Sequence, residues 1–361
     1  MEAIQKKRVS PRAQRLLLRD TEKTRQDMGE IAIIFNPSSG KGKAARKKPL
    51  LEAYLNANRI RYKMFVTQSE EHLVRTAAQV SRDYPVIVGA GGDTTITLIA
   101  SQIIRLQRGN TLGVIGLGSI NDLAREIGVL RLDQACAAIR AGHTIDLDVG
   151  VINSRLHDEP TFFLVQASLG LGVTINRYVV DWMKKHSLLN RFSSMTQPFV
   201  AISGFYHSYR NNIVPVRFDL KQANATNAIY SPFVIFYNTS VCAREFRLSP
   251  HASPVDGKLD CCVIHAPTLP HFIQGLIQFK RQKNQQSDNV SVFRDDKFTI
   301  HSPHPLEIQI DGEIHQTDGR IEVSTRPRAI KLLVNPRFTR RLNLQPRSGN
   351  IVQESLPLPV D

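Results

Sequence analysis

Short apolar runs alternate with longer mixed segments between residues 31 and 142. Runs such as Ile31–Phe35 and Val86–Gly89 are apolar throughout, which is typical of parallel strands buried on both faces. The segments between them are long enough for the helices that connect such strands. The pattern therefore predicts a doubly wound parallel sheet. The predicted strands are Ile31–Phe35, Arg61–Val66, Val86–Gly89 and Leu112–Ile115, and the predicted helices cover Lys43–Asn58, Glu70–Arg82, Thr95–Leu106 and parts of Asn121–Ala141.

The pattern changes after about residue 143, where strand-length segments are separated by Asp-Gly turns such as Asp256-Gly257 and Asp318-Gly319. Such spacing favours an antiparallel second domain, a sandwich of two sheets. Its predicted strands are Ile145–Ile152, Thr161–Ala167, Val214–Leu220, Ile229–Asn238, Lys258–Ile264, Leu306–Ile310 and Arg320–Val323. Helical insertions are predicted at Ile175–Lys185, Gln197–Tyr209 and Leu269–Lys280, and a last strand, Ile330–Val334, is expected to return toward the first domain.

These patterns divide the chain into four parts. We predict a basic leader over residues 1–29, an α/β domain over 30–142, a β-rich domain over 143–335 and a Pro- and Arg-containing tail over 336–361. The leader places basic residues around Leu16–Leu18. It fits either a solvated extension or an amphipathic segment that lies on acidic lipid.

Composition narrows the choice of partners. The 361 residues suffice for two domains whose cores need no disulfides. The formal net charge of +15 favours anionic partners such as phosphorylated ligands or an acidic membrane surface. No recognised nucleic-acid-reading motif occurs, so we predict no nucleic-acid partner. The sequence has no spanning run of apolar residues, no secretory signal and four cysteines without metal spacing, which predicts a cytoplasmic protein. A homodimer is compatible with the sequence.

Three loops of small and polar residues follow three of the predicted strands, at Asn36–Gly42, Gly91–Thr95 and Gly116–Arg125. Because the carboxyl ends of parallel strands meet at one edge of a sheet, we expect the loops to form one ligand site. Glycine lets backbone amides approach a phosphate, and a following helix adds the positive end of its dipole. The first loop does not have the P-loop spacing.

The residue types in these loops suit phosphoryl transfer, which needs phosphate positioning, charge neutralisation and a base. Asp93 offers oxygen ligands to Mg²⁺. Asn36, Asn121 and Asp122 are expected to bind the nucleotide's sugar or to position the loops. Asn121 and Asp122 also suit a cap of the following helix, and the capping and positioning roles can hold together. Small-residue amides and hydroxyls for the phosphates come from Ser39, Gly40, Gly91, Gly92 and Ser119.

Together the loops resemble those of the diacylglycerol kinase catalytic domain family, which includes bacterial lipid kinases, sphingosine kinases and ceramide kinases. In that family Asn-Pro-x-Ser-Gly, Gly-Gly-Asp-Gly-Thr and Pro-x-Gly-Thr-x-Asn-Asp loops form the nucleotide site. They appear here as Asn36–Gly40, Gly91–Thr95 and Gly116–Asp122. Further downstream, Leu248–Pro250, Ala252 and Asp256–Asp260 are similar to the family's Ser-Pro…Ala…Asp-Gly segment, and Asp311-Gly312-Glu313 is similar to its Asp-Gly-Glu motif.

The resemblance implies an ATP- and Mg²⁺-dependent kinase, with nucleotide bound by residues 30–142 and a lipid substrate bound by residues 143–335. It implies that Glu313 is the general base, that Asp93 acts in catalysis and holds Mg²⁺, and that Asp256 belongs to a separate structural metal site. The implied nucleotide contacts are Asn36, Ser39, Gly40, Gly91, Gly92, Thr95, Gly118, Ser119, Asn121 and Asp122.

The chain departs from the family pattern at several positions. Thr94 replaces the second glycine of Gly-Gly-Asp-Gly-Thr, and Leu98 replaces a glutamate. We expect the Cβ of Thr94 to crowd a bound phosphate or to conflict with a positive φ. The other departures are Gly116, Ser119, Ile120, Gln166 and the run Cys242–Glu245.

Three functions follow from this sequence. The leading one is an ATP-dependent lipid kinase that phosphorylates a hydroxyl of diacylglycerol, a sphingoid base or a related lipid while its basic charge holds it peripherally at an acidic membrane. The alternative is a weak or inactive relative that binds lipid or nucleotide, as the substitutions at Thr94 and Leu98 suggest. A kinase for a soluble substrate, such as the NAD kinases, ranks last because the Asn-Glu pair of that family is missing.

Overall fold

The structure is a computed structural model that describes residues 29–170, 216–222, 225–231, 233–240, 252–264, 290–302 and 304–341, with residues 173, 174, 177, 270 and 274. The predicted leader, the three predicted helical insertions and most of the predicted tail lie wholly or largely outside these residues. No helix within the described part is long and apolar enough to span a membrane.

Four parallel strands form one end of a ten-stranded sheet, in the order β2-β1-β3-β4. They are β1 (Ile31–Phe35), β2 (Tyr62–Val66), β3 (Val86–Gly91) and β4 (Thr111–Gly116). All five side chains of β1 are buried, as its apolar run predicts. The predicted doubly wound sheet is confirmed.

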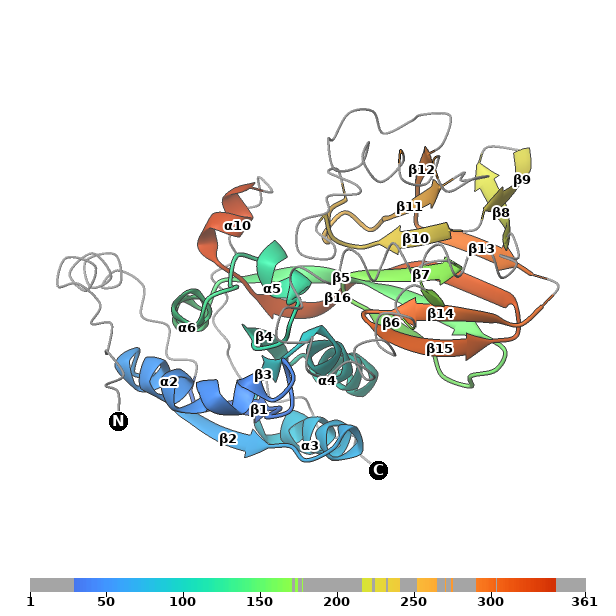
Figure 1. The fold of residues 1–361 in the computed structure, drawn as a ribbon. Helices are drawn as coiled ribbons and strands as arrows, with labels where there is room; N and C mark the ends of the chain where they lie inside the picture. The colour runs from blue at the N-terminus through green and yellow to red at the C-terminus, as the bar shows by residue number, and fades with distance from the viewer. Residues whose placement is uncertain are drawn as a thin grey trace, which may run out of the picture.

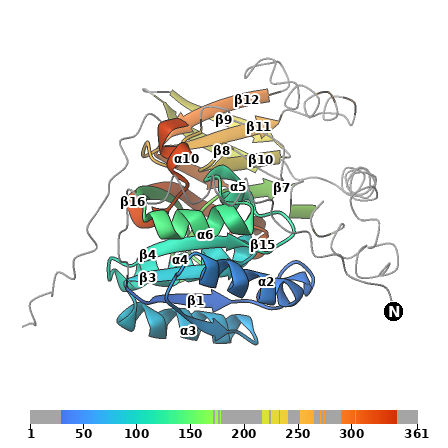
Figure 2. The same cartoon turned by 90° about the vertical axis from the view of Figure 1, so that its left-hand side faces the viewer.

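Helices cover both faces of this parallel part (Figures 1 and 2). Helix α2 (Lys43–Ala57) lies beside α6 (Leu132–Ala141), and α3 (Glu70–Asp83) lies beside α4 (Asp93–Leu106). A short helix, α5 (Asp122–Glu126), follows the loop after β4. Helix α2 begins directly after the first small-residue loop, and α4 and α5 begin within the second and the third, so the loops lie at the carboxyl edge of the strands.

The long strand β16 (Arg320–Leu333) joins the parallel part to the rest of the molecule. Near its end it pairs in parallel with β4, through Lys331 opposite Thr111. Along its length it pairs antiparallel with β5 (Thr144–Ser154). The predicted return of the chain toward the first domain is therefore confirmed. Helix α10 (Pro336–Arg341) follows, and its Phe338 is buried in the core of the parallel part.

A second, six-stranded antiparallel sheet packs against the continuation of the first sheet, in the order β12-β11-β10-β7-β14-β15. Its core contains Leu169, Phe236 and Ile308 from this sheet, packed with Phe298 and Val323 from the ten-stranded sheet. This is the predicted antiparallel sandwich. The remaining strands of the first sheet are β6 (Thr161–Phe163), β8 (Val216–Gln222), β9 (Ala225–Ser231) and β13 (Lys297–His301). Those of the second are β7 (Gln166–Gly170), β10 (Phe233–Tyr237), β11 (Leu259–Ile264), β12 (Val290–Asp295), β14 (Leu306–Ile310) and β15 (Glu313–Thr317).

The prediction of single strands at Thr161–Ala167 and Ile229–Asn238 is wrong. Each segment contains two strands that belong to different sheets, β6 with β7 and β9 with β10. In the first case the chain leaves one sheet at Leu164 and enters the other at Gln166, and the amides of both residues bind the carboxylate of Asp311. Apolar runs alone do not show such a crossing, because both sheets bury the same kind of side chain.

The prediction of two separate strands over Arg320–Val323 and Ile330–Val334 is also wrong, since β16 is continuous. Its register against β5 shifts between Arg326 and Ile330, and Arg328 has a φ of 53°. The sequence pattern of such a bulge is the same as that of a loop between two strands. Strands β12, β13 and β15 were not predicted.

Gly150 provides a test of the sandwich. It lies opposite Phe163 in the β5–β6 pair, and a Cβ on Gly150 would lie 2.0 Å from Cζ of the buried ring. We predict that Gly150→Ala lowers the free energy of unfolding by about 1–3 kcal/mol through overpacking, measured by urea denaturation. The same substitution in a Phe163→Leu background should cost less. Equal costs in the two backgrounds would contradict this packing.

Candidate active site

Hydrogen bonds fasten the loop after β1 to the start of α4. The amide group of Asn36 donates to the hydroxyl of Thr95 at 3.0 Å, and the backbone amide of Gly92 donates to the hydroxyl of Ser39 at 3.2 Å. The Ser39 and Thr95 hydroxyls are 3.5 Å apart. The structure thus brings together Asn36, Ser39, Gly92 and Thr95, which the sequence predicts as nucleotide contacts.

Glycines allow the three loops to approach each other. A Cβ on Gly118 would lie 2.5 Å from Cα of Gly92, and a Cβ on Gly40 would lie 2.6 Å from the carbonyl oxygen of Leu117. Gly40 also has a φ of +61°. The amide of Leu117 donates to the carbonyl of Gly91 at 2.7 Å. The backbones of the loops can therefore approach each other this closely only because these positions lack side chains.

The start of α4 is the part of these loops best suited to bind a phosphate. The amides at residues 42–45 donate to carbonyls at residues 37–40, so the first turn of α2 is already occupied. The N-cap residue of α4 is Gly92, and, as in α2, no side chain caps the helix. The leading amides of a helix point along its axis and attract anions. We therefore expect phosphates at the N-terminus of α4.

The loop after β4 is shaped by Asn121. This residue has a φ of 57°, its side-chain oxygen accepts the amide of Gly118 at 2.7 Å, and its side-chain nitrogen donates to the Gly118 carbonyl at 2.9 Å. Ser119 is exposed in the same loop, while Asp122 is buried in the first turn of α5. Asn121 is the N-cap residue of α5 but makes no side-chain cap bond, so of the roles predicted for it, loop positioning is the one that its contacts describe.

Asp93 connects α4 to α5. One carboxylate oxygen accepts the amide of Leu123 at 3.3 Å. Burial raises the pKa of Asp93 above its usual range, and the backbone amides around Asp122 partly oppose this. A Mg²⁺ site in a nucleotide enzyme needs only one or two carboxylates when phosphates supply further oxygens. Asp93, beside the expected phosphate position, fits that requirement.

Asp256 lies apart from these loops. Its carboxylate forms an ion pair with Arg294 and accepts the amide of Lys258 at 3.0 Å. Among the described residues no group of three or more His, Cys, Asp or Glu side chains is arranged to hold a metal. The charge of Asp256 is therefore already balanced within the protein, and its metal role stays a prediction.

Asp311 is the buried centre of the turn between β14 and β15. One carboxylate oxygen accepts the hydroxyl of Thr97 and the amide of Leu164, both at 2.7 Å. The other accepts the amides of Val165 at 3.1 Å and Gln166 at 2.9 Å. Burial raises the pKa of Asp311 to about 6, while its donors pull that pKa down. With four donors, this carboxylate is poorly suited to receive a proton from a substrate.

Glu313 follows at the start of β15 and is the better candidate for a base. Its side chain is half-buried. Burial raises the pKa of Glu313 to about 7, and the negative charges of Glu70 and Asp311 add to the shift. A carboxylate whose pKa lies near neutrality can both take up and release a proton under ordinary conditions. The two acids of the Asp-Gly-Glu turn thus differ in what they can do. Asp311 is held by hydrogen bonds, whereas Glu313 has a pKa near neutrality.

The expected conflict with a positive φ at Thr94 is not found. Thr94 lies in the first turn of α4 and is absent from the residues with positive φ. Its hydroxyl donates to the carbonyl of Asp311 at 3.5 Å, and a Cβ on Gly312 would lie 3.8 Å from that hydroxyl. Leu98 packs, partly buried, against the core of the parallel part. Both substituted side chains are accommodated by the fold.

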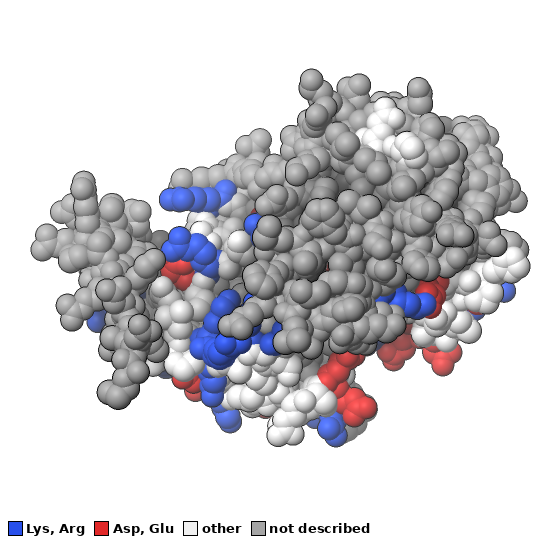
Figure 3. Space-filling view, viewed as in Figure 1, with Lys and Arg blue, Asp and Glu red and all other residues white. Residues whose placement is uncertain are grey.

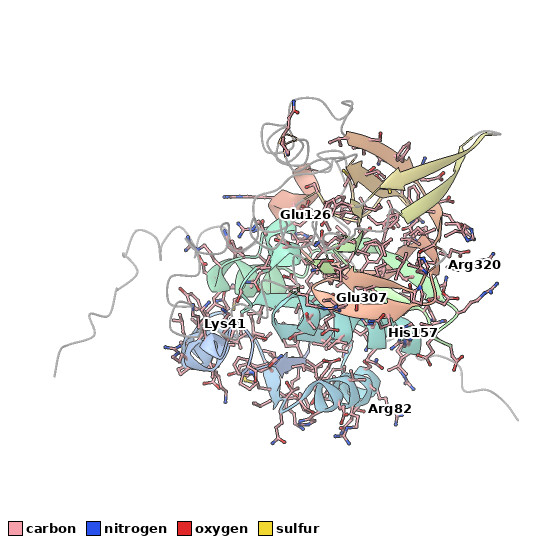
Figure 4. The ribbon with its side chains drawn as sticks, turned by 45° about the vertical axis from the view of Figure 1, so that its right-hand side comes forward. Lys41, Arg82, Glu126, His157, Glu307 and Arg320 are labelled. Carbon is pink, nitrogen blue, oxygen red and sulfur yellow. The ribbon has the colours of Figure 1, made fainter. Side chains whose placement is uncertain are left out.

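Sequence reasoning missed several residues around the turn. Thr97 was not singled out, although it stands three residues after Thr94 and thus on the same face of α4. Glu70 had been assigned only to the start of a helix. His315 is half-buried on β15, where burial and His157 lower its pKa. Figure 4 shows His157 and Glu307 on the side of the molecule that carries β14 and β15, and Lys41 at the start of α2.

The fold and the loops define a two-part protein of the NAD kinase-like type, with a mostly parallel α/β sheet and an antiparallel sandwich. The sequence profile of the diacylglycerol kinase catalytic domain matches residues 30–152, and that of the YegS C-terminal NAD kinase beta sandwich-like domain matches residues 200–334. The chain belongs to the diacylglycerol kinase catalytic domain family and carries a C-terminal domain of the YegS type.

Individual relatives are distant. The chain is 24% identical over 293 residues to a diacylglycerol kinase of Bacillus subtilis (strain 168), an alignment that covers 79% of this chain and 90% of the relative. It is 23% identical over 286 residues to a diacylglycerol kinase of Staphylococcus aureus (strain bovine RF122 / ET3-1), covering 78% and 85%. A crystal structure of a diacylglycerol kinase from Bacillus anthracis str. Sterne matches with a TM-score of 0.63 at 17% identity, covering 88% and 100%. The structural match supports the fold.

Gly40 and Gly109 offer a matched test of the loop geometry. Both have a positive φ, of +61° and +72°, but a Cβ on Gly109 meets nothing within 4 Å. We predict that Gly40→Ala weakens ATP binding by about tenfold or more, because the methyl group would push the Leu117 loop away. Gly109→Ala should bind ATP as the unmodified protein does. Isothermal titration calorimetry with both variants measures this, and equal affinities would refute the predicted contact between the loops.

Proposed function

We propose that this protein is an ATP-dependent lipid kinase that phosphorylates a hydroxyl of diacylglycerol, a sphingoid base or a related lipid at a membrane surface. The observation that carries the proposal is the contact between α4 and the turn at Asp311–Glu313. It brings a half-buried acid next to the helix whose N-terminus suits a phosphate. Family membership, and relatives named diacylglycerol kinases, support the reaction class.

The proposed reaction is a direct transfer of the γ-phosphoryl group. The amides of the α4 N-terminus hold the nucleotide phosphates, with Asn36 and Ser39 fixing the adjacent loop. Glu313 takes the proton of the lipid hydroxyl while that oxygen attacks the γ-phosphorus. The bond from the γ-phosphorus to the bridging oxygen breaks, and ADP leaves. Asp93 would hold Mg²⁺, which would supply neutralisation of the phosphate charge.

Basic side chains support a peripheral position on an acidic membrane. Figure 3 shows Lys and Arg side chains gathered on the side of the molecule that carries α2 and α6, and acidic side chains nearer α3 and β15. The basic residues before and within the first half of α2 are Lys41, Lys43, Arg46, Lys47 and Lys48. In the proposal they attract anionic lipid from the cytoplasmic side, where the membrane surface is negative.

Phosphate transfer from labelled ATP to mixed vesicles tests the proposal. The vesicles contain diacylglycerol, monoacylglycerol, sphingosine and ceramide, and the assay includes Mg²⁺. We predict a labelled lipid with the unmodified protein and none with Asp93→Asn, and the identity of that lipid gives the substrate class. A folded protein that labels no lipid above the Asp93→Asn control would contradict the proposal and favour the alternative of a relative that only binds nucleotide or lipid.

The pH dependence tests the role of Glu313. A base acts in its charged form, and the pKa of Glu313 is about 7. The rate should therefore rise as the pH increases through about 7 and fall on the acidic side. Glu313→Gln should abolish transfer and leave ATP affinity nearly unchanged. Glu322→Gln removes a surface carboxylate that pairs with Lys297, so it should keep both the rate and the profile. Transfer by Glu313→Gln would rule out this base.

A further inference from the structure

We propose that Thr97 and Thr94 are positioning residues, which tie the nucleotide-binding helix α4 to the turn that carries the base and so couple nucleotide binding to the placement of Glu313. This inference rests on the proposed function, and neither residue is assigned to contact the substrate. It gives a role to two of the three threonines at the start of α4, one of them at a position where the family has glycine.

The first step of the argument is the location of Asp311. Its carboxylate is buried at the meeting point of three parts of the chain. Three of its four donors are backbone amides of consecutive residues, Leu164 to Gln166, where the chain passes between the two sheets. The fourth is the hydroxyl of Thr97. Of these four donors, Thr97 alone lies on α4.

The second step is the spacing of the two threonines. Residues three apart lie on the same face of a helix. Thr97 bonds the side chain of Asp311 at 2.7 Å, and Thr94 bonds its backbone carbonyl at 3.5 Å. The turn is thus held at two points by one helical face. The contact made by Thr94 lies in the first turn of α4, which is expected to bind phosphate.

The third step links Asp311 to Glu313. Only Gly312 separates them, and it has a φ of +100°. Gly312 has no side chain that would fix the turn by packing, and Asp311 itself has a φ of 44°. Glu313 is paired with Ile310 in the β14–β15 hairpin, so the placement of Glu313 depends on that pairing and on how firmly the turn at Asp311 is held. A shift of α4 on nucleotide binding would move Asp311, and Glu313 would move with it.

The variants are chosen so that the fold survives. Thr97→Val keeps the volume, removes the hydroxyl and leaves the three amide donors of Asp311 in place. Thr97→Ser keeps the hydroxyl. Thr76→Val is the matched control, since Thr76 is also a buried helical threonine whose hydroxyl makes a 2.7 Å bond, in this case to the carbonyl of His72 within α3. Thr94→Val tests the second contact alone.

Hydrogen exchange measures the coupling without requiring phosphate transfer. With ADP and Mg²⁺ bound, exchange of the amides at residues 312–317 should slow by about threefold or more in the unmodified protein, in Thr97→Ser and in Thr76→Val. In Thr97→Val this protection should be largely lost although ADP still binds. Equal protection in Thr97→Val and Thr76→Val would overturn the proposal, whether or not the protein proves to be a kinase.

Kinetics give the second readout. In the vesicle assay, Thr97→Val should lower kcat by about tenfold with little change in the KM for ATP, because a displaced base slows the chemical step and leaves ground-state binding intact. The acidic limb of its pH profile should move to lower pH, since without the Thr97 hydroxyl the carboxylate of Asp311 is harder to ionise, and its negative charge is one cause of the raised pKa of Glu313. Thr94→Val should lower kcat less, and Thr97→Ser should restore it. A Thr97→Val variant with the kcat and pH profile of Thr76→Val would contradict the positioning role.

Discussion

The buried carboxylate of Asp311 is the constraint on which the site depends. A charged group loses its hydration when it is buried, so it must be compensated by hydrogen bonds from the protein. Four donors do so here, three from the crossing between the sheets and one from α4. The three amides bind residues 164–166 to these two oxygens, and the hydroxyl of Thr97 binds α4 to one of them. The turn before Glu313, the sheet crossing and the nucleotide helix are therefore held in one arrangement.

The continuous sheet gives this arrangement its frame. Because β16 pairs with β4 at one end and with β13 at the other, the parallel part and the sandwich share one set of backbone hydrogen bonds. Loops at the carboxyl edge of the parallel strands then face the turn between β14 and β15 (Figure 1). In the proposed function, the phosphate side and the base side of the site come from different halves of the chain.

The sequence was sufficient for the fold class and for the loops, because apolar runs, glycines and short polar motifs are local signals. Asn36, Gly92 and Thr95 were predicted in one site and lie in one site. Two features had no local signal. The donors of Asp311 come from residues far apart in sequence, and a helical threonine such as Thr97 looks like any other. At Thr94 the expected conflict with a positive φ is wrong, and the hydroxyl contacts the carbonyl of Asp311 instead, while crowding of a phosphate stays a prediction.

The most direct test of the account is a crystal structure of the protein with Mg²⁺ and a non-hydrolysable ATP analogue. The account predicts that the terminal phosphate lies against the first amides of α4, with Asp93 beside it and the carboxylate of Glu313 facing the open side of the γ-phosphorus. A nucleotide bound away from these loops, or a Glu313 carboxylate turned away from the terminal phosphate, would contradict it.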